Sequence, residues 1–166
     1  MQIDDDHMYH GAALIQIAED PQFTAINALQ YKDKLCKVAY RINDSITVYL
    51  KYATTPSRTF KEYQFVFTRA QLDELSSIAE HEQHVFLALV CVKGREICGI
   101  SYGTLLDFIE KRKKAKGAPE AQYTLLVTIP KGKSLRAYMN EPGKRKTILG
   151  DPVIIPRKNF PALIFQ

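Results

Sequence analysis

The spacing of apolar residues predicts a helix near the start of the chain. From Gly11 onward, apolar side chains recur every three to four residues until Pro21. Because the residue before a proline is pushed out of the helical region, we expect this helix to end just before Pro21. Residues 1–9 lack such spacing and are expected to form a mobile tail, whereas Thr24–Leu29 favours a second short helix.

The pattern then changes to one in which apolar and polar residues alternate, and this predicts strands. Three strands are expected at Leu35–Ile42, Ser45–Ala53 and 62–67, with a tight turn at Asn43-Asp44 between the first two. A polar loop that contains Pro56 leads to the third strand. On that strand the aromatic side chains face one way, and Glu62 and Gln64 face the other.

Capping residues divide the middle of the chain. Thr68 and Gln71 have the spacing of a capping box, and Ser101 is suited to cap a later helix that Gly117 ends. An almost wholly apolar run between the two helices is typical of a central strand that is covered on both faces. These signals predict a helix from Thr68 through Ala79, strands at His84–Val92 and Glu96–Ile100, and a helix from Ser101 to about Lys114.

The last third of the chain is rich in strand signals. Short strands are predicted at Tyr123–Ile129, Leu135–Met139, Thr147–Leu149 and Val153–Ile155, the last two as a pair. The apolar segment Phe160–Phe165 is expected to dock back on the body of the protein. We therefore predict a single α+β domain over residues 10–166, with a core at 10–116 and a basic, strand-rich extension at 117–166.

Composition narrows the class of protein further. The 166 residues are 46% hydrophobic and 25% charged, and a chain of this length buries enough surface to fold without disulfides or a metal. No apolar run approaches the roughly 18 residues of a membrane span, and no signal peptide is recognisable. The spacing of Cys36, Cys91 and Cys98 fits no zinc template. We expect a soluble protein of the reduced cytoplasm that does not bind membranes.

Charge is distributed unevenly, although the formal net charge is only +5. Residues 1–30 carry −5, residues 31–110 are neutral, and residues 111–166 carry +10. Such a basic segment suits a polyanion, so nucleic acid is the predicted partner. The residues expected to contact it are Lys111, Arg112, Lys113, Lys114, Lys144, Arg145, Lys146, Arg157 and Lys158, with Tyr123, Tyr138 and Phe160 interleaved for base stacking.

Over residues 10–92 the predicted order of elements is a helix, three antiparallel strands, a helix and a central strand, or α-β-β-β-α-β. Two acidic residues lie on or beside the second and third of these strands. Asp44 opens the second strand, and Glu62-Tyr63-Gln64 lies on the third. This arrangement resembles the core of the PD-(D/E)XK superfamily, the fold of restriction endonucleases. The resemblance implies a Mg²⁺-dependent nuclease in which Asp44 and Glu62 hold the metal, while Gln64 or Lys51 orients the water or the phosphate. Gln64 replaces the lysine of the family motif.

Each of these features also has an ordinary structural explanation. Asn43-Asp44 is common hairpin-turn chemistry because both residues tolerate positive φ, and Glu62 and Gln64 fit the solvated face of an edge strand. A nuclease-like core with a degenerate site would bind nucleic acid without cleaving it. The alternative function is a non-catalytic protein-interaction module, of accessory or immunity type, or a homodimer. A third hypothesis is a small-ligand enzyme that uses His10 or His84.

Overall fold

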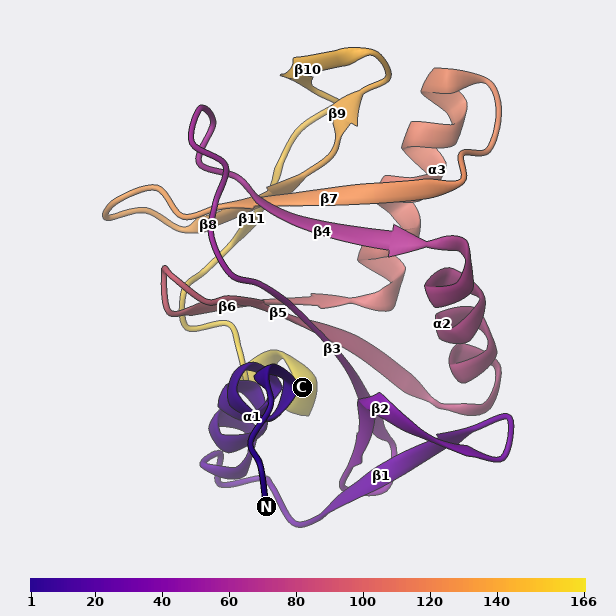
Figure 1. The fold of residues 1–166 in the computed structure, drawn as a ribbon, viewed down its shortest axis with the longest axis vertical. Helices are drawn as coiled ribbons and strands as arrows, with labels where there is room; N and C mark the ends of the chain where they lie inside the picture. The colour runs from indigo at the N-terminus through magenta and orange to yellow at the C-terminus, as the bar shows by residue number, and fades with distance from the viewer.

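Two β-sheets face each other in the computed structural model, which describes all of residues 1–166 (Figure 1). The helices are α1 (Asp5–Ala18), α2 (Arg69–His81), α3 (Tyr102–Lys116) and the short 3₁₀ helix η1 (Ala162–Phe165). The strands are β1 (Ile26–Tyr31), β2 (Lys34–Ile42), β3 (Ile46–Ala53), β4 (Tyr63–Thr68), β5 (His84–Cys91), β6 (Glu96–Ser101), β7 (Gln122–Thr128), β8 (Leu135–Tyr138), β9 (Asn140–Glu141), β10 (Lys144–Ile148) and β11 (Val153–Ile155). The predicted α+β class is confirmed.

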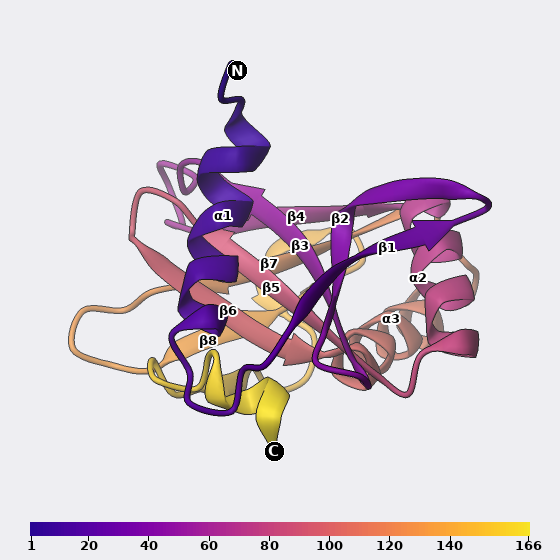
Figure 2. The same ribbon diagram turned by 90° about the horizontal axis from the view of Figure 1, so that it is seen from below.

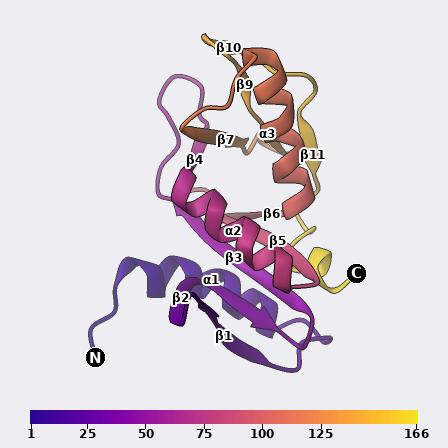
Figure 3. The ribbon, with the colours of Figure 1, turned by 90° about the vertical axis from the view of Figure 1, so that its right-hand side faces the viewer.

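The elements lie in layers. α1 and η1 cover the outer face of the first sheet, and α2 and α3 close one side of the space between the sheets (Figures 1 and 3). The β9–β10 hairpin lies beyond the second sheet, at the end of the molecule opposite α1 (Figure 3). None of the three α-helices combines the length and the apolar sequence that crossing a bilayer requires.

The first sheet has the strand order β1-β2-β3-β5-β6. Its central strands, β3 and β5, are parallel and in register from Ile46↔His84 to Ala53↔Cys91, and the other pairs are antiparallel. Helices or the second sheet cover both faces of β5, so five of its residues in succession are buried. This confirms the central strand that its continuous apolar run predicts.

β4 does not join the first sheet, which corrects the predicted set of three antiparallel strands. It pairs antiparallel with β7, from Tyr63↔Val127 to Thr68↔Gln122, as an edge of a second sheet with the order β11-β8-β7-β4. The loop 54–62 between β3 and β4 is longer than the roughly two to five residues of a usual hairpin connection, so it can carry the chain to the other sheet. Residues of the predicted core and of the predicted extension therefore share one sheet.

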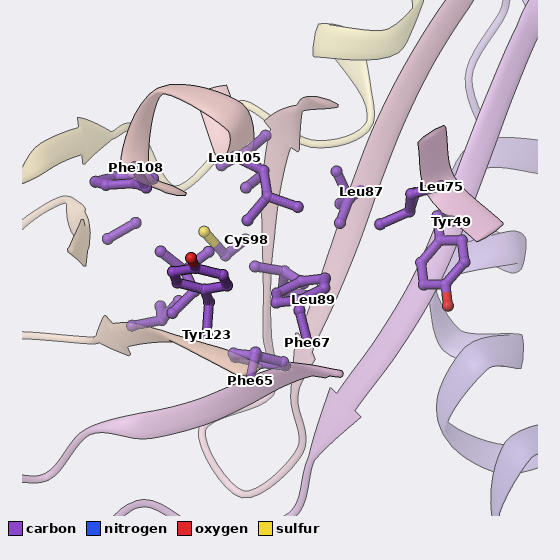
Figure 4. Packing of buried hydrophobic residues seen from close by; sticks show 14 of the residues in the cluster. Tyr49, Phe65, Phe67, Leu75, Leu87, Leu89, Cys98, Leu105, Phe108 and Tyr123 are labelled. Carbon is purple, nitrogen blue, oxygen red and sulfur yellow. The ribbon is translucent and has the colours of Figure 1, made fainter. Parts of the chain in front are cut away.

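The main core lies between the two sheets (Figure 4). Phe65 and Phe67 of β4 are at most 1% exposed and belong to the same buried cluster as Leu87 and Leu89 of β5. The other elements add Leu75 from α2, Leu105 and Phe108 from α3, and Tyr123 from β7. Burial of each large apolar side chain stabilises the fold by roughly 1.5–3 kcal/mol, so this aromatic face determines how β4 is oriented.

The start of α1 corrects the predicted tail, because residues 5–9 are helical. The Asp4 carboxylate accepts from the His7 amide at 2.9 Å, and the Asp4 amide donates to His7 Nδ1 at 3.1 Å. This reciprocal capping box satisfies two N–H groups that a helix leaves free. The capping residues thus begin the helix well before its apolar spacing becomes visible.

The C-terminal segment docks on the body, as its apolar sequence predicts. Phe160 and Ile164 share a second buried cluster with Ala13 and Ile17 of α1, on the outer face of the first sheet. Figure 2 shows η1 beside the end of α1. The first sheet is therefore covered on both faces.

Two further strand assignments differ from the predicted ones. Ile26–Tyr31 is a strand and not part of a short helix, because Lys32 and Asp33 adopt positive φ of 50° and 60° and form a tight turn into β2. β10 pairs with β9 and β11 pairs with β8, so the last two predicted strands do not pair with each other.

His10 is the one buried histidine of the fold. It is 5% exposed, its ring centroid lies 5.4 Å from that of Tyr52, and its Nδ1 is enclosed without a hydrogen-bond partner. Burial lowers the pKa of His10, and the charge of Lys51 acts in the same direction, whereas Asp6 and Asp4 oppose the shift. The fold therefore favours the neutral imidazole.

We predict that the folded protein loses stability as the pH falls below about 6.5. Because the pKa of His10 lies below its ordinary value of 6.5 in the folded state, the unfolded chain takes up the proton first as the pH drops. The urea midpoint of the wild type should fall between pH 7 and pH 5, and that of His10→Phe should fall less. His81→Asn, which changes an exposed histidine, is the control, and its urea midpoint should fall as much as that of the wild type. If the midpoint of His10→Phe also falls as much as that of the wild type, His10 is not the source of the pH dependence.

Candidate functional site

The two carboxylates predicted to share a metal lie at opposite ends of β3. Asp44 is exposed in the turn just before β3 begins, whereas Glu62 lies after the loop that leaves the far end of this strand. An eight-residue strand spans roughly 25 Å at about 3.3 Å per residue. No three His, Cys, Asp or Glu side chains lie close enough together to hold a metal ion. A Mg²⁺ ion bound jointly by Asp44 and Glu62 does not fit this geometry.

The other two predicted catalytic residues also separate. Gln64 lies with Glu62 on the outer face of the second sheet, as the strand period predicts, and both line the same cleft. Lys51 lies on the inner side, where its Nζ is 3.2 Å from Gln71 Oε1 and 4.9 Å from the ring centroid of Phe67. Burial in this position lowers the pKa of Lys51. Of the four predicted catalytic residues, Glu62 and Gln64 therefore line one cleft, whereas Asp44 and Lys51 do not line it.

A cleft of about 800 Å³ lies on the outer face of the second sheet. Its floor is the outer face of β4 and β7, and its walls are the loop Ser57–Phe60 and the β9–β10 hairpin. Gln64, Gln122 and Thr124 contribute polar side chains to it, and only 4 of its 18 lining residues are hydrophobic. A second hollow of about 440 Å³ shares Ser57, Glu62 and Gln64 with it. A polar ligand suits such a surface better than an apolar one.

Glu62 is buried where the two hollows adjoin. Its Oε2 accepts a hydrogen bond from the hydroxyl of Tyr138 on β8, and its backbone amide donates to Ser57 Oγ at 3.1 Å. The Ser57 amide donates in turn to the Glu62 carbonyl at 2.9 Å, which closes the loop between them. Burial, together with the Glu62 carboxylate, raises the pKa of Tyr138, so the phenol stays protonated and keeps donating.

Arg112 holds the hairpin wall in place and is not free to bind a ligand. Its guanidinium donates to both carboxylate oxygens of Glu120, at 2.6 and 3.0 Å, and to the Asn140 carbonyl at 2.6 Å. The ion pair holds the pKa of Glu120 below its ordinary value, chiefly through the hydrogen bonds from Arg112. Arg112 thereby joins α3 to β9.

Arg157 is also used inside the fold. It donates to the Lys133 and Pro130 carbonyls, at 2.7 and 2.6 Å, and to Glu96 Oε1 at 2.9 Å. It therefore fixes the segment after β11 to the β7–β8 loop and to the start of β6. Lys158, the next residue, is exposed.

The remaining predicted cations lie on α3 and on the β9–β10 hairpin. On α3, Lys113 pairs weakly with Glu110 at 3.4 Å, and Lys111 and Lys114 are exposed without an acidic partner. All five residues of β10 are exposed. Lys144 lies 3.6 Å from Glu141 at the surface, and an exposed pair of this kind contributes little to stability.

Three cations at the cleft have no acidic partner: Arg58, Arg145 and Lys146. Arg58 and Arg145 line the cleft from opposite walls. Lys146 Nζ lies 5.8 Å from the ring centroid of Phe60, so this contact crosses from the hairpin to the loop. The net positive charge at the mouth of the cleft comes from these three side chains.

Sequence reasoning missed Arg58 and Phe60, and assigned Tyr138 a different role. Tyr123, Tyr138 and Phe160, expected to stack on bases, are only 5%, 7% and 6% exposed and offer no open ring face for stacking. Phe60 is the exposed aromatic side chain at the cleft instead. The sequence does contain a signal for this part of the site, because Phe60 is an aromatic residue in a polar loop that also carries Arg58.

Comparison with known proteins gives no independent guide to this site. No family model matches the chain, and neither a curated protein nor a solved structure does so. The candidate site therefore rests on the geometry of the cleft, the Glu62–Tyr138 pair in its floor and the three unpaired cations around it.

We predict that Arg112→Met destabilises the protein by about 2 kcal/mol, because it leaves Glu120 and the Asn140 carbonyl without their charged donor. Hydrogen exchange should quicken selectively at the amides of residues 139–149. Lys111→Met, an exposed neighbour on the same helix, is the control and should change stability by less than about 0.5 kcal/mol. Equal stability and equal exchange in the two variants would show that Arg112 does not hold the hairpin.

Proposed function

We propose that the protein binds single-stranded nucleic acid in the cleft between the loop Ser57–Phe60 and the β9–β10 hairpin. The observation that carries this proposal is the placement of Arg58, Arg145 and Lys146 around one polar cleft, each without an acidic partner. Phosphate groups are the anions that recur along a nucleic-acid strand, and Lys and Arg are the side chains that neutralise them. Three free cations around a cleft suit such a ligand.

The floor of the cleft supports a ligand with bases or sugars rather than a bare anion. Gln64, Gln122 and Thr124 present amide and hydroxyl groups that both donate and accept hydrogen bonds. Phe60 offers an aromatic face at the wall, and base stacking on aromatic side chains is common in single-strand binding. Phosphates at the rim and bases on the sheet face are thus compatible with one binding mode.

The size of the cleft favours a single strand over a duplex. A hollow of about 800 Å³ has the volume of a small-molecule site, which is enough for a short stretch of nucleotides. The loop Ser57–Phe60 and the β9–β10 hairpin line opposite sides of the cleft, so an intact double helix would meet them before its bases reached the floor. Binding without cleavage is sufficient for this proposal, because Asp44 and Lys51 lie away from Glu62 and Gln64.

A protein-interaction module is the second candidate, and one observation favours it. β11 is one of the two edge strands of the second sheet and carries the exposed apolar residues Val153 and Ile154. An exposed edge of this kind can pair with a strand of another chain. This candidate takes precedence if no oligonucleotide binds at low salt.

The first function predicts salt-dependent binding of a single-stranded oligonucleotide of about ten residues, measured by fluorescence anisotropy. Log affinity should fall linearly with log salt, with a slope of about −0.7 for each phosphate that the protein neutralises. Arg58→Glu with Arg145→Glu should weaken binding at least about tenfold and flatten the slope by about 0.7 for each phosphate that is no longer neutralised.

The matched control is Lys37→Glu with Lys93→Glu, which makes the same change in net charge at two exposed, unpaired lysines that do not line the cleft. It should retain most of the affinity. An equal loss of affinity in both double variants would assign the binding to net charge alone, and the absence of binding at about 20 mM salt would reject the function.

A further inference from the structure

Glu62 is the only acidic side chain that the fold buries, and it lies in the floor of the basic cleft. It is 6% exposed, and the other buried polar residues are His10 and Thr47. A buried carboxylate is costly unless hydrogen bonds compensate for its lost hydration. The single side-chain donor that reaches it is the Tyr138 hydroxyl, at Oε2. The carboxylate is therefore held in one orientation while part of its capacity to accept stays unused.

The unused acceptor is Oε1, the second oxygen of a side chain that lines the cleft. No hydrogen bond within the protein reaches this atom, and the only fully enclosed side-chain atoms without a partner belong to His10 and Thr47. Glu62 lines both hollows that meet at this point. A carboxylate can only accept hydrogen bonds, so whatever lies against Oε1 must present a donor.

A ligand that fills the cleft must therefore carry two kinds of chemical group. Arg58, Arg145 and Lys146 require anionic groups at the mouth, and Glu62 requires a neutral hydrogen-bond donor at the floor. A phosphate cannot occupy both places, because it would be repelled by the Glu62 carboxylate. In a ribonucleotide strand, each phosphate is followed by a sugar that bears a 2′-hydroxyl, which can donate, whereas the sugar of DNA has no such donor.

We propose that the ligand is RNA rather than DNA, and that Glu62 Oε1 accepts a hydrogen bond from a ribose 2′-hydroxyl. This inference rests on the proposed function and names the substrate class of the same cleft. Tyr138 is a positioning residue, because it fixes the carboxylate without touching the ligand. A deoxyribose in the same place would set a CH₂ group against the free oxygen and leave that buried acceptor unpaired. This lost hydrogen bond lowers the binding free energy of DNA relative to that of RNA.

The test compares matched strands of one base sequence on the whole protein, by fluorescence anisotropy at one salt concentration. Oligouridine RNA and the corresponding deoxyuridine strand carry the same base, so the sugar is the only difference between them. We expect the RNA to bind about tenfold more tightly, the factor that one charge-assisted hydrogen bond produces. A 2′-fluoro strand keeps an RNA-like sugar without the donor and should bind as weakly as the DNA.

Two variants assign the preference to Glu62. Glu62→Met with Tyr138→Phe replaces both members of the buried pair by apolar groups of similar shape, so no orphaned donor remains. It should bind RNA and DNA within about twofold of each other, with the DNA affinity of the wild type. Tyr138→Phe alone keeps the carboxylate but no longer fixes its orientation, so it should keep a reduced preference for RNA. If the double variant does not fold, the 2′-fluoro strand still tests the donor on the wild type.

The possible outcomes separate this inference from the function on which it rests. Equal, salt-dependent binding of RNA and DNA would overturn the RNA assignment and leave the single-strand function standing. So would 2′-fluoro RNA that binds like RNA, or a preference for strands containing adenine, guanine or cytosine whatever the sugar, since base amino groups would then be the donors. Failure of every strand to bind would overturn both.

Discussion

The pairing of β4 with β7 places the core and the cleft on opposite faces of the same sheet. Phe65 and Phe67 are buried against the first sheet, and since side chains alternate along a strand, Gln64 must point the other way. Glu62 and Gln64 line the cleft on that outer face. The apolar contacts that hold the two sheets together therefore also determine which polar residues can meet a ligand.

Local signals were sufficient to predict the elements whose ends depend on nearby residues. Thr68 and Ser101 cap α2 and α3, Gly117 ends α3 in a left-handed conformation, and the apolar run after α2 forms β5. Partnership between strands depends on distant residues instead. Nothing within β4 distinguishes pairing with β3 from pairing with β7, which explains why its sheet was assigned incorrectly.

The candidate site was predictable in part for the same reason. The period of a strand places Glu62 and Gln64 on one face, so this pair was found from the sequence. The partner of Glu62 lies 76 residues away, at Tyr138, and no spacing rule connects the two. Basic clusters likewise mark cations without indicating which are free: Arg112 is neutralised by Glu120, whereas Arg145 has no partner. Exposure and pairing are properties of the folded chain.

The aperture of the cleft depends on Arg112, a lining side chain whose guanidinium nitrogens all donate within the protein. Its planar guanidinium serves Glu120 and the Asn140 carbonyl together, and a lysine, which offers a single compact charge, cannot satisfy both. Neither Arg112 nor Glu120 can be exchanged alone without releasing the hairpin or leaving a charge unpaired. A substitution at either position therefore requires a matching change at the other if the width of the cleft is to be kept.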